Sequence, residues 1–515
     1  MGLARTWSIT LTGIIGQLVE VEADLAPGLP GCTLVGLPDA ALSEARDRIR
    51  AAILNSGESW PSRRITLGLS PADLPKHGSR LDVAMAVAIL AAAGAVPAAP
   101  VAEMVFLGEL GLDGGLRPTR GVLPAVLAAS AAGRRRVVVP AANAREARLV
   151  PDVEIWAAAR LGDLLTALRD GRPPPDDPGA GGSADTDVPA SAAMTAPHGD
   201  LADVLGQPTG RRAIEVAAAG GHHLFLVGDP GTGKTMLASR LPSLLPDLSH
   251  AEALEVTAVY SVAGALPAET PIIKRPPFRD PHHSTSVAAL IGGGSGLARP
   301  GQVSLAHRGV LFLDEAPEFS PTVLDALRQP LESGRVTIAR SGGTTSYPAR
   351  FLLVLAANPC PCAAAGRNRE CTCSPMMRRR YLSRLSGPLL DRVDLQVRMD
   401  PVSRAELLAD RRHTEPGAVV AKRVALAQQR AAERWSGTPW RTNAEIPGPY
   451  LRSQWPLSRS ALAGVERALD TGFLSARGLD RVLRVAWTLA DLADVDRPGR
   501  EHVDEALYLR TGIPA

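Results

Sequence analysis

Apolar positions beyond residue 200 follow two patterns along the chain. Short apolar runs bounded by turn residues are typical of buried parallel strands, and they occupy 222–228, 309–314 and 349–358. Beyond about residue 400 the apolar positions recur at helical spacing, as in 475–492, where Ser475 is a plausible helix N-cap. The apolar stripe of that helix consists of Leu479, Val482, Leu483, Ala486 and Leu489. The pattern predicts a parallel sheet followed by a helical unit.

The first 168 residues alternate between helix-type and strand-type patterns. Helical patterns occupy 46–57 and 81–96, and the second is so apolar that we expect it to be largely buried. Strand-type runs occupy 64–71, 135–140 and 153–158. We therefore expect an α/β or α+β domain over this part of the chain.

A segment rich in Pro, Gly, Asp, Ser and Ala separates this unit from the rest. Residues 171–200 contain almost no large apolar side chain, so they cannot bury a core and are expected to be disordered. The predicted organisation is an N-terminal domain over 1–168, a linker over 169–200, a core domain over 201–400 and a helical lid domain over 401–515.

Composition excludes some classes of protein. The chain has 515 residues, 45% of them hydrophobic, and a net charge of +3, so its overall charge does not predict a nucleic-acid binder. No run of 18 apolar residues predicts a membrane span, and the first residues lack the pattern of a secretory signal. We expect a cytoplasmic chain without membrane contact, where clustered cysteines favour metal binding or catalysis over disulfides.

The apolar run at 222–228 leads into GDPGTGKT, which fits the pattern G-x-x-x-x-G-K-[ST] and is followed by a helical pattern. Glycines in such a loop allow backbone N–H groups to wrap the phosphates of a nucleotide at a helix N-terminus. Lys234, one of only four lysines, would neutralise the β- and γ-phosphates of ATP, and Thr235 would hold Mg²⁺. The predicted nucleotide-binding residues are Gly228, Asp229, Pro230, Gly231, Thr232, Gly233, Lys234 and Thr235.

The next two apolar runs end at candidate catalytic residues. One delivers Asp314, which could organise Mg²⁺, and Glu315 follows it, placed to polarise an attacking water. The other ends at Asn358, whose neutral amide could orient water beside the γ-phosphate. The alternatives are two solvated carboxylates at an ordinary strand end, and an asparagine that forms a turn before Pro359.

Four of the five cysteines lie immediately after Asn358. They form two C-x-C pairs separated by eight residues: Cys360, Cys362, Cys371 and Cys373. Four thiolates in two close pairs suit tetrahedral Zn²⁺, and we predict a structural zinc clip in an insert over 359–375. An Fe–S cluster, or thiols that are unmetallated or disulfide-linked, are the alternatives. The fifth, Cys32, is expected in a core.

The chain is also locally basic around this insert. Residues 359–385 contain a single acid, Glu370, against six arginines, at positions 367, 369, 378, 379, 380 and 384. Such a cluster inside a near-neutral chain predicts binding to DNA phosphates. A solvated basic loop or an inter-subunit surface are the alternatives.

Taken in order, these motifs resemble those of the AAA+ ATPases. Residues 201–515 are similar to the magnesium-chelatase-like branch, and the whole chain is similar to the ComM/YifB-type proteins. The stretches that carry the resemblance are GDPGTGKT, KRPPFRDPHHSTSVAALIGGG, GQVSLAHRGVLFLDEAPEF, LRQPLESGRVTIAR, YPARFLLVLAANPCPC and LLDRVDL. The resemblance implies an AAA+ P-loop core with a parallel sheet, in a homo-hexameric ring. It also implies an ATP-driven helicase that acts on single-stranded or branched DNA and promotes branch migration during recombination or transformation.

The resemblance assigns roles to matching residues. The phosphate-loop, metal, water-activating and first-sensor roles fall on Lys234, Thr235, Asp314, Glu315 and Asn358. Arg392 matches the arginine finger that a neighbouring subunit presents to ATP, where a cation stabilises transition-state charge. The alternative for Arg392 is an ion pair with Asp391 or Asp394. Arg477 best matches the second-sensor arginine, and two more arginines share its helical stripe, Arg481 and Arg484.

Two further segments match insertions of this branch. Two β runs around a Ser-Gly-Gly turn predict a hairpin at 334–351. The resemblance implies that it faces the ring pore, where Arg340 would touch phosphates; a purely structural hairpin is the alternative. The sequence FRDPHH at 278–283 falls in the other insertion, so His282 and His283 are either pore-facing or structural.

The N-terminal unit resembles the Lon-type proteolytic domain, an α+β fold of the ribosomal S5 domain 2-like class. Aligned on Lys76, the protease serine falls on Arg80, with Ser79 one place away. No lysine lies between Lys76 and Lys234, and arginine cannot replace the lysine of a Ser–Lys dyad because it does not lose its proton. We expect no proteolysis, and instead an assembly or DNA-facing scaffold.

Three functions compete for the chain. The first is an ATP-driven DNA motor. The second is a chelatase-type ATPase that remodels a partner protein for metal insertion into a tetrapyrrole, and the third is a regulatory ATPase without translocation. The resemblance favours the first, because chelatase motors lack the cysteine insert and the N-terminal unit, and because arginines surround the insert.

Overall fold

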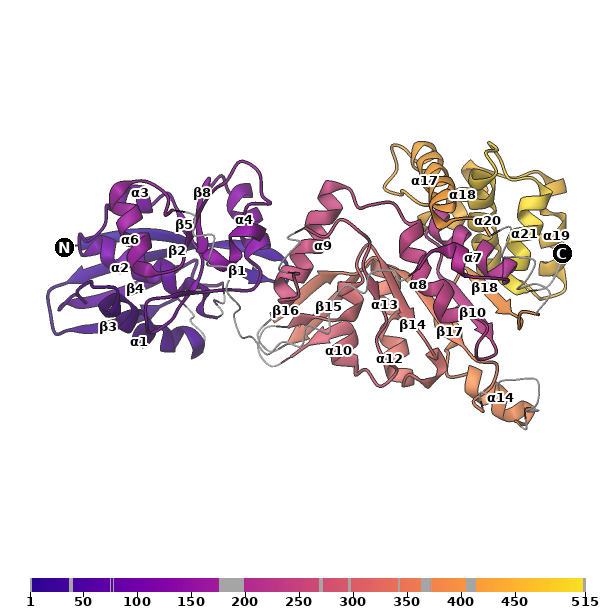
Figure 1. Ribbon diagram of the computed structural model, residues 1–515, viewed down its shortest axis with the longest axis horizontal. Helices are drawn as coiled ribbons and strands as arrows, with labels where there is room; N and C mark the ends of the chain where they lie inside the picture. Colours follow the sequence, from indigo (N-terminus) through magenta and orange to yellow (C-terminus); the bar gives the residue numbers. More distant parts are fainter. Residues whose placement is uncertain are drawn as a thin grey trace.

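The computed structural model describes residues 2–36, 40–74, 76, 78–175, 199–267, 272–294, 298–340, 343–362, 371, 373–403 and 414–512. Arg367, Arg369 and most of the predicted linker lie outside these residues. Figure 1 shows an elongated molecule with one sheet in the N-terminal region, a second sheet in the middle, and the C-terminal helices at the far end. None of the described helices is long and apolar enough to cross a bilayer.

The N-terminal region folds around a seven-stranded mixed sheet in the order β3-β4-β2-β1-β5-β8-β9. A long antiparallel hairpin forms its centre, and α2 covers it with ten buried residues, as the uniformly apolar sequence of this helix predicts. The strands are β1 (Gly2–Thr12), β2 (Ile15–Ala26), β3 (Gly31–Val35), β4 (Arg64–Ser70), β5 (Val105–Phe106), β8 (Arg136–Pro140) and β9 (Glu154–Ala158). The main helices are α1 (Ala40–Asn55), α2 (Asp82–Ala92), α4 (Val122–Ala131), α5 (Ala144–Ala147) and α6 (Leu161–Asp170).

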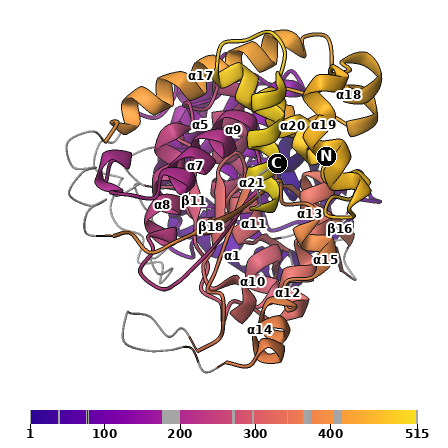
Figure 2. The same ribbon diagram turned by 90° about the vertical axis from the view of Figure 1, so that its right-hand side faces the viewer.

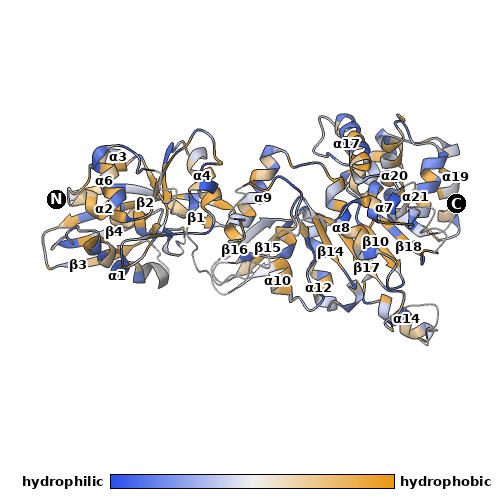
Figure 3. Cartoon of the chain, viewed as in Figure 1, coloured by the Kyte–Doolittle hydropathy of each residue, from blue (hydrophilic) through white to orange (hydrophobic). Residues whose placement is uncertain are grey.

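The second sheet has five parallel strands in the order β11-β14-β17-β10-β18. They are β10 (Leu224–Gly228), β11 (Phe278–Arg279), β14 (Val310–Leu313), β17 (Leu352–Ala357) and β18 (Leu395–Met399). Every residue of β17 is buried: alternate residues from Leu352 join one apolar cluster, and those from Leu353 join another. Both faces are thus covered, which explains the unbroken apolar runs of the sequence, seen as apolar strands in Figure 3.

Because these strands are parallel, all their carboxyl ends lie at one edge of the sheet, the carboxyl edge, and all their amino ends lie at the opposite amino edge. Helices and a hairpin connect the strands. They are α7 (Pro208–Gly220), α8 (Lys234–Leu244), α9 (His250–Ala263), α10 (Val287–Ile291), α11 (Gln302–Leu305), α12 (Pro321–Ala326), α13 (Arg328–Ser333), β15 (Arg335–Arg340), β16 (Gly343–Pro348), α14 (Pro375–Leu382) and α15 (Gly387–Leu390). The β15–β16 pair is the hairpin expected at 334–351.

The described residues 414–512 form a helical region. Its helices are α17 (Gly417–Arg434), α18 (Gly448–Gln454), α19 (Arg459–Asp470), α20 (Ala476–Leu492) and α21 (Arg500–Thr511). Ser475 caps α20 as expected, accepting a hydrogen bond from the Gly478 N–H at 3.1 Å. Most of the apolar stripe of α20 packs against α7 and α21, in the cluster that also contains β10 and β18, and Leu483 joins a second cluster with Trp435. Figure 2 views this region end-on, with α17 across the top and α14 projecting below.

The N-terminal region contacts the second region through α9. Helix α4 packs along α9, and Ala258 of α9 joins the apolar cluster of α4. Beside this contact, Ser261 of α9 donates to the buried Glu146 carboxylate at 2.5 Å, and the Gly121 N–H donates to the Ser261 carbonyl at 3.0 Å. Ile14, in the turn between β1 and β2, packs into a second apolar cluster that includes α9. The two regions therefore share one continuous interface.

Candidate nucleotide site and cysteine cluster

The phosphate loop lies at the carboxyl edge, between β10 and the first residue of α8. Gly231 and Gly233 have φ values of 82° and 88°, a left-handed conformation that glycine adopts without strain. A Cβ atom at Gly228 would lie 2.5 Å from the Met399 carbonyl oxygen of β18, so only glycine fits there. The loop therefore leads into the N-terminus of an 11-residue helix, where free N–H groups favour an anion.

Lys234 is buried at the base of this loop. Its Nζ donates to the carbonyl oxygens of Gly228 and Asp229, at 2.6 and 3.0 Å, and to Oδ1 of Asn358 at 3.1 Å. Burial lowers the pKa of Lys234, and the negative charges of Asp314 and other nearby acids oppose that change. The amine is thus held by weak neutral acceptors, which a nucleotide phosphate would outcompete.

The structure brings Thr235 of α8 and Asp314, which directly follows β14, together. The Thr235 hydroxyl donates to Asp314 Oδ2 at 2.6 Å. A hydroxyl and a carboxylate oxygen are the ligands Mg²⁺ prefers, so the pair fits the predicted metal site beside the loop. The structure thus joins four predicted site residues into one cluster at the carboxyl edge: Lys234, Thr235, Asp314 and Asn358.

Glu315 lies next to this cluster in an unusual conformation. Its φ of 49° is in the left-handed region, which is strained for a residue with a side chain. Its half-exposed carboxylate lies 3.7 Å from Nδ1 of His283, whose ring packs against His282 with centroids 4.0 Å apart. The sequence did not reveal the pairing of His283 with Glu315; its only signal was the HH dipeptide just after the residues that form β11.

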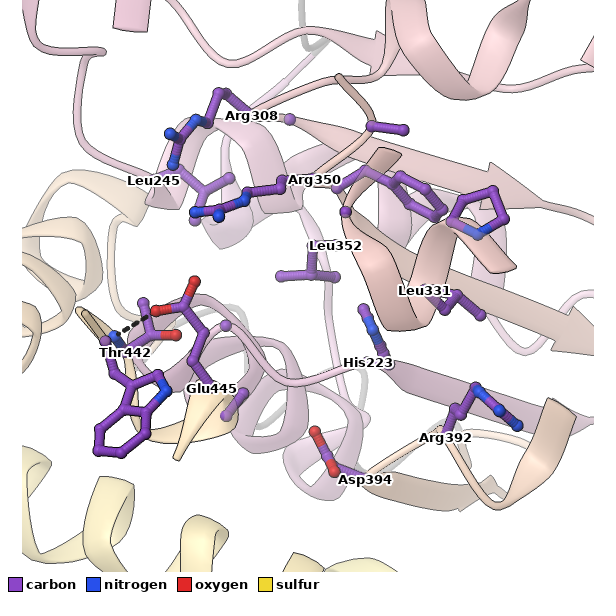
Figure 4. Close-up of a pocket in the computed structure, with 18 of the residues that line it drawn as sticks. His223, Leu245, Arg308, Leu331, Arg350, Leu352, Arg392, Asp394, Thr442 and Glu445 are labelled. Atoms are coloured by element: carbon purple, nitrogen blue, oxygen red, sulfur yellow. Dashed lines mark hydrogen bonds between the residues drawn. The ribbon is translucent and has the colours of Figure 1, made fainter. Parts of the chain in front are cut away.

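Arg392 and Arg477 lie at the amino edge, away from the phosphate loop of their own chain. Both line a cavity of about 880 Å³ that also reaches His223 and Leu352, which mark the amino ends of β10 and β17. Figure 4 shows Arg392 and Asp394 on one side of this cavity and Glu445, from the helical region, on another. The structure therefore does not join these arginines to Lys234 within one subunit.

Arg392 forms an ion pair, but with a different partner from the two aspartates expected from the sequence. Arg392 pairs with Glu332 of α13, and not with Asp391 or Asp394. Asp391 lies 3.4 Å from Arg477, and Asp394 lies 2.9 Å from Arg481. The Arg392–Glu332 pair was not predicted, because the two residues are 60 positions apart in sequence and meet only in the folded chain.

The four clustered cysteines converge immediately after Asn358. All four Sγ atoms lie within 4.8 Å of one another, and none forms a disulfide. The Sγ of Cys360 lies 3.2 Å from that of Cys362 and 3.4 Å from that of Cys371. Four thiols from two short segments match a closed tetrahedral zinc site in number and kind.

Helix α14 follows the cysteines and projects from the body of the molecule (Figures 1 and 2). Ser374 caps it, and the side chains of Met376 and Met377 are 79% and 52% exposed. Its three arginines are exposed as well: Arg378, Arg379 and Arg380. Arg384 instead forms an ion pair with Glu318 at 3.1 Å. Among the described arginines of this segment, the three on α14 are therefore exposed, and Arg384 is partly neutralised by Glu318.

Ser79, Lys76 and Arg80, the residues compared with a protease dyad, do not pair with one another in the structure. The Ser79 hydroxyl donates to the Glu109 carboxylate, and the buried Lys76 donates to the Pro71 carbonyl. Arg80 is enclosed, which lowers its pKa to about 10, and it donates to the Arg120 carbonyl at 2.6 Å. In the described residues these contacts serve packing, and they pair the serine with a carboxylate rather than an amine.

Comparison with known proteins matches three family models along the chain. "Magnesium chelatase, subunit ChlI" matches residues 200–407, "Subunit ChlI of Mg-chelatase" matches 21–143, and "Magnesium chelatase, subunit ChlI C-terminal" matches 414–510. These matches cover the second sheet, most of the N-terminal region and the helical region.

Similar proteins align over nearly the whole chain. An uncharacterized protein of Mycobacterium tuberculosis is 55% identical over 99% of both chains. The protein YifB of Escherichia coli is 41% identical over 99% of this chain and 97% of its own. The competence protein ComM of Haemophilus influenzae is 41% identical over 100% of this chain and 98% of its own. The chain therefore belongs to the ComM/YifB-type family of magnesium-chelatase-like ATPases.

Proposed function

We propose that this protein is an ATP-hydrolysing AAA+ motor that works as a ring of six copies on single-stranded or branched DNA. In this proposal it promotes branch migration during recombination or transformation. The observation that carries it is the separation of Lys234 and Asp314 from Arg392, which lie at opposite edges of one sheet. A site divided in this way is completed when the amino edge of one copy meets the carboxyl edge of the next.

The chain's own residues account for the hydrolytic step. The phosphate loop binds the triphosphate, and Lys234 moves from Asn358 to the β- and γ-phosphates. Thr235 and Asp314 would hold Mg²⁺, which would neutralise phosphate charge. Glu315 takes up the proton of the attacking water, and Asn358 orients that water without adding charge.

The neighbouring copy supplies Arg392, and Arg477 beside it, to the same γ-phosphate. A fixed cation at this position stabilises the charge that develops in the transition state. Because the arginine belongs to another copy, hydrolysis depends on ring assembly. The cavity that both arginines line gives them the room to meet a nucleotide.

The cysteine cluster and α14 form the DNA-contacting part of the proposal. Zinc held by the four thiolates would fix a short polar segment that has too few apolar residues to fold alone. The cluster begins two residues after Asn358, so a change at the nucleotide has a short path to the arginines of α14. Arginines of an exposed helix bind DNA phosphates without reading the sequence.

Similarity to a competence protein over the full chain supports the DNA motor over the chelatase alternative. The direct test is a branch-migration assay on a Holliday-type junction with the wild-type protein beside Lys234→Ala. The proposal expects ATP-dependent conversion by the wild type and none by the variant. ATP hydrolysis without any strand exchange, together with a response to a tetrapyrrole-bound partner, would support the chelatase function instead.

A further inference from the structure

The segment that carries Arg392 is anchored by one buried carboxylate. Asp394 is 1% exposed, and its Oδ1 accepts a hydrogen bond from Arg481 of α20 at 2.9 Å. Its Oδ2 lies 3.1 Å from Nδ1 of His222. The backbone N–H of Asp394 donates to the His223 carbonyl at 3.1 Å, and the Val393 carbonyl accepts from Arg510 of α21. Two residues past Arg392, the chain therefore has almost no freedom to shift.

The anchor continues into the helical region as a buried polar network. Nε2 of His222 lies 2.8 Å from the hydroxyl of Thr488, which also accepts from Asn443 at 3.0 Å. Asn443 donates to Asp491 at 2.8 Å, and Asp491 pairs with Arg434 of α17. Buried networks of this kind are rigid when every member has a partner. The network therefore joins the segment of Arg392 to three helices of this region.

Both arginines of the amino edge depend on the same carboxylate. Arg481 lies one helical turn after Arg477 on α20, so the Asp394–Arg481 pair fixes the height of Arg477 relative to Arg392. His222 and His223 directly precede β10, and β10 ends at the phosphate loop. The Asp394 carboxylate thus fixes the positions of α20, the Arg392 segment and β10 relative to one another, and β10 leads to the chain's own nucleotide site.

Asp394 carries its charge inside the protein. Burial alone would raise the pKa of Asp394, but the charge of Arg481 and the hydrogen bond with His222 outweigh it and hold the pKa well below its usual range. A buried carboxylate with its partners removed is strongly destabilised, so these contacts resist displacement.

We propose that Asp394 is a positioning residue that aims Arg392 and Arg477, as a unit, at the nucleotide bound to the neighbouring subunit. The inference rests on the proposed ring with its arginines acting in trans, and it adds a residue to which the matched motifs assign no such role. Asp394 acts through the arginines and does not itself touch ATP.

The test uses mixed rings of two impaired variants. Asp394→Asn keeps its own phosphate loop, and Lys234→Ala keeps correctly aimed arginines. Alone, Asp394→Asn is expected to lower kcat about 10- to 100-fold, because displaced arginines stabilise the transition state less well. KM for ATP should change little, because the variant's own phosphate loop still binds the nucleotide. Mixed one to one with Lys234→Ala, its hydrolysis should rise several-fold above the sum of the separate variants.

A mixture of Arg392→Ala and Lys234→Ala is the control, since Arg392 is itself the group proposed to act in trans. If this control rises and the Asp394→Asn mixture does not, Asp394 acts within its own subunit and the positioning role is wrong. If the control also fails to rise, the trans arrangement is wrong and the inference falls with it.

A milder pair of variants covers the case in which Asp394→Asn does not fold. Thr488→Val removes the hydroxyl that holds His222, and Thr488→Ser retains it. The proposal expects Thr488→Val to show the same lowered kcat, unchanged KM and recovery in mixed rings, with Thr488→Ser close to the wild type. Equal activity of the two variants would overturn the proposal.

Discussion

At the residue scale, the proposed roles at the carboxyl edge assign binding of ATP and its hydrolysis to different residues. Glu315 pairs with His283 beside the phosphate loop, whereas Lys234 is buried within the loop. We expect Glu315→Gln to bind ATP as the wild type does and to hydrolyse it at least about 100-fold more slowly, because the proposed general base is lost. Nucleotide-binding and single-turnover measurements check this, and a variant that hydrolyses ATP normally would remove Glu315 from the mechanism.

His283 provides a second residue-scale prediction. Its imidazole lies beside the Glu315 carboxylate, and the tilted His282 ring packs against it with centroids 4.0 Å apart. We expect His283→Ala to lower kcat while KM for ATP stays the same, because the imidazole restrains the proposed base and not the nucleotide. His282→Ala is the matched control for loss of a ring, and an unchanged kcat for His283→Ala would show that this contact does not support hydrolysis.

Asp82 makes the stability of the N-terminal region depend on pH. Burial raises the pKa of Asp82 to about 6, against the pull of Arg48. The folded state therefore binds a proton that the unfolded state releases, so stability is lost as pH rises from about 4 to about 6 and is constant above. Relative to Asp82→Asn, the wild type should lose about 3 kcal/mol over that range.

Amide hydrogen exchange of α2 measures this difference, because Asp82 is the first residue of that helix. Asp47→Asn, at an exposed position of α1, is the control and should track the wild type at every pH. A wild-type stability that runs parallel to that of Asp82→Asn between pH 4 and pH 7 would show that burial does not perturb this carboxyl.

Site residues could be predicted from the sequence where the adjacent residues form a recognisable motif. The glycines and Lys234 stand in one eight-residue pattern, and Asp314 and Asn358 each end an apolar run, so the parallel sheet was bound to bring them together. Glu332 and His222 carry no such pattern. Their partners lie 60 and 172 residues away, and only the packed fold sets those distances.

At the element scale, α14 and the cysteine cluster act as one unit. Zinc would hold Cys360 and Cys362 against Cys371 and Cys373, and α14 starts at the second residue after the last of them. We expect about one equivalent of zinc per chain in purified protein, and less than about half an equivalent would count against the site. Cys371→Ser should lose the stimulation of ATP hydrolysis by DNA while ATP binding is kept. Unchanged stimulation would show that the cysteine cluster has no role in the response to DNA.

The arginines of α14 give a second prediction at this scale. Arg379→Ala combined with Arg380→Ala should weaken DNA binding and lower the slope of log affinity against log salt by about 1 to 2, because each phosphate contact releases counterions. Arg459→Ala, at an exposed position on α19, is the control and should leave the slope unchanged. An unaltered slope for the double variant would place the DNA contact elsewhere.

Elements were predictable where packing is regular. The runs that form β10, β14 and β17, the capped helix α20 and the hairpin of β15 and β16 all follow from periodicity and turn residues. Two-residue strands such as β5 and β11 escaped, because two residues show no period and only the sheet defines them. The packing of α4 on α9 was equally hidden, because nothing in the sequence of either helix names the partner on which it packs.

At the scale of the whole molecule, the two edges of the second sheet define its proposed assembly. The carboxyl edge holds the phosphate loop, and the amino edge holds Arg392 and Arg477 beside a large cavity. The N-terminal region is fastened to α9 through Glu146 and Ser261, so it would move with the core of its subunit. We therefore propose that a ring carries this region as a rigid attachment, and not as a tethered module.

The central claim is that DNA controls ATP hydrolysis by this protein. The most direct measurement is the steady-state ATP hydrolysis rate of the full chain with and without forked and single-stranded DNA, paired with a gel-shift assay. The account predicts that DNA raises the rate several-fold in the wild type, that Lys234→Ala binds DNA without hydrolysis, and that Arg392→Ala stays at the unstimulated level. A hydrolysis rate that neither DNA changes, together with no shift in the gel, would contradict it.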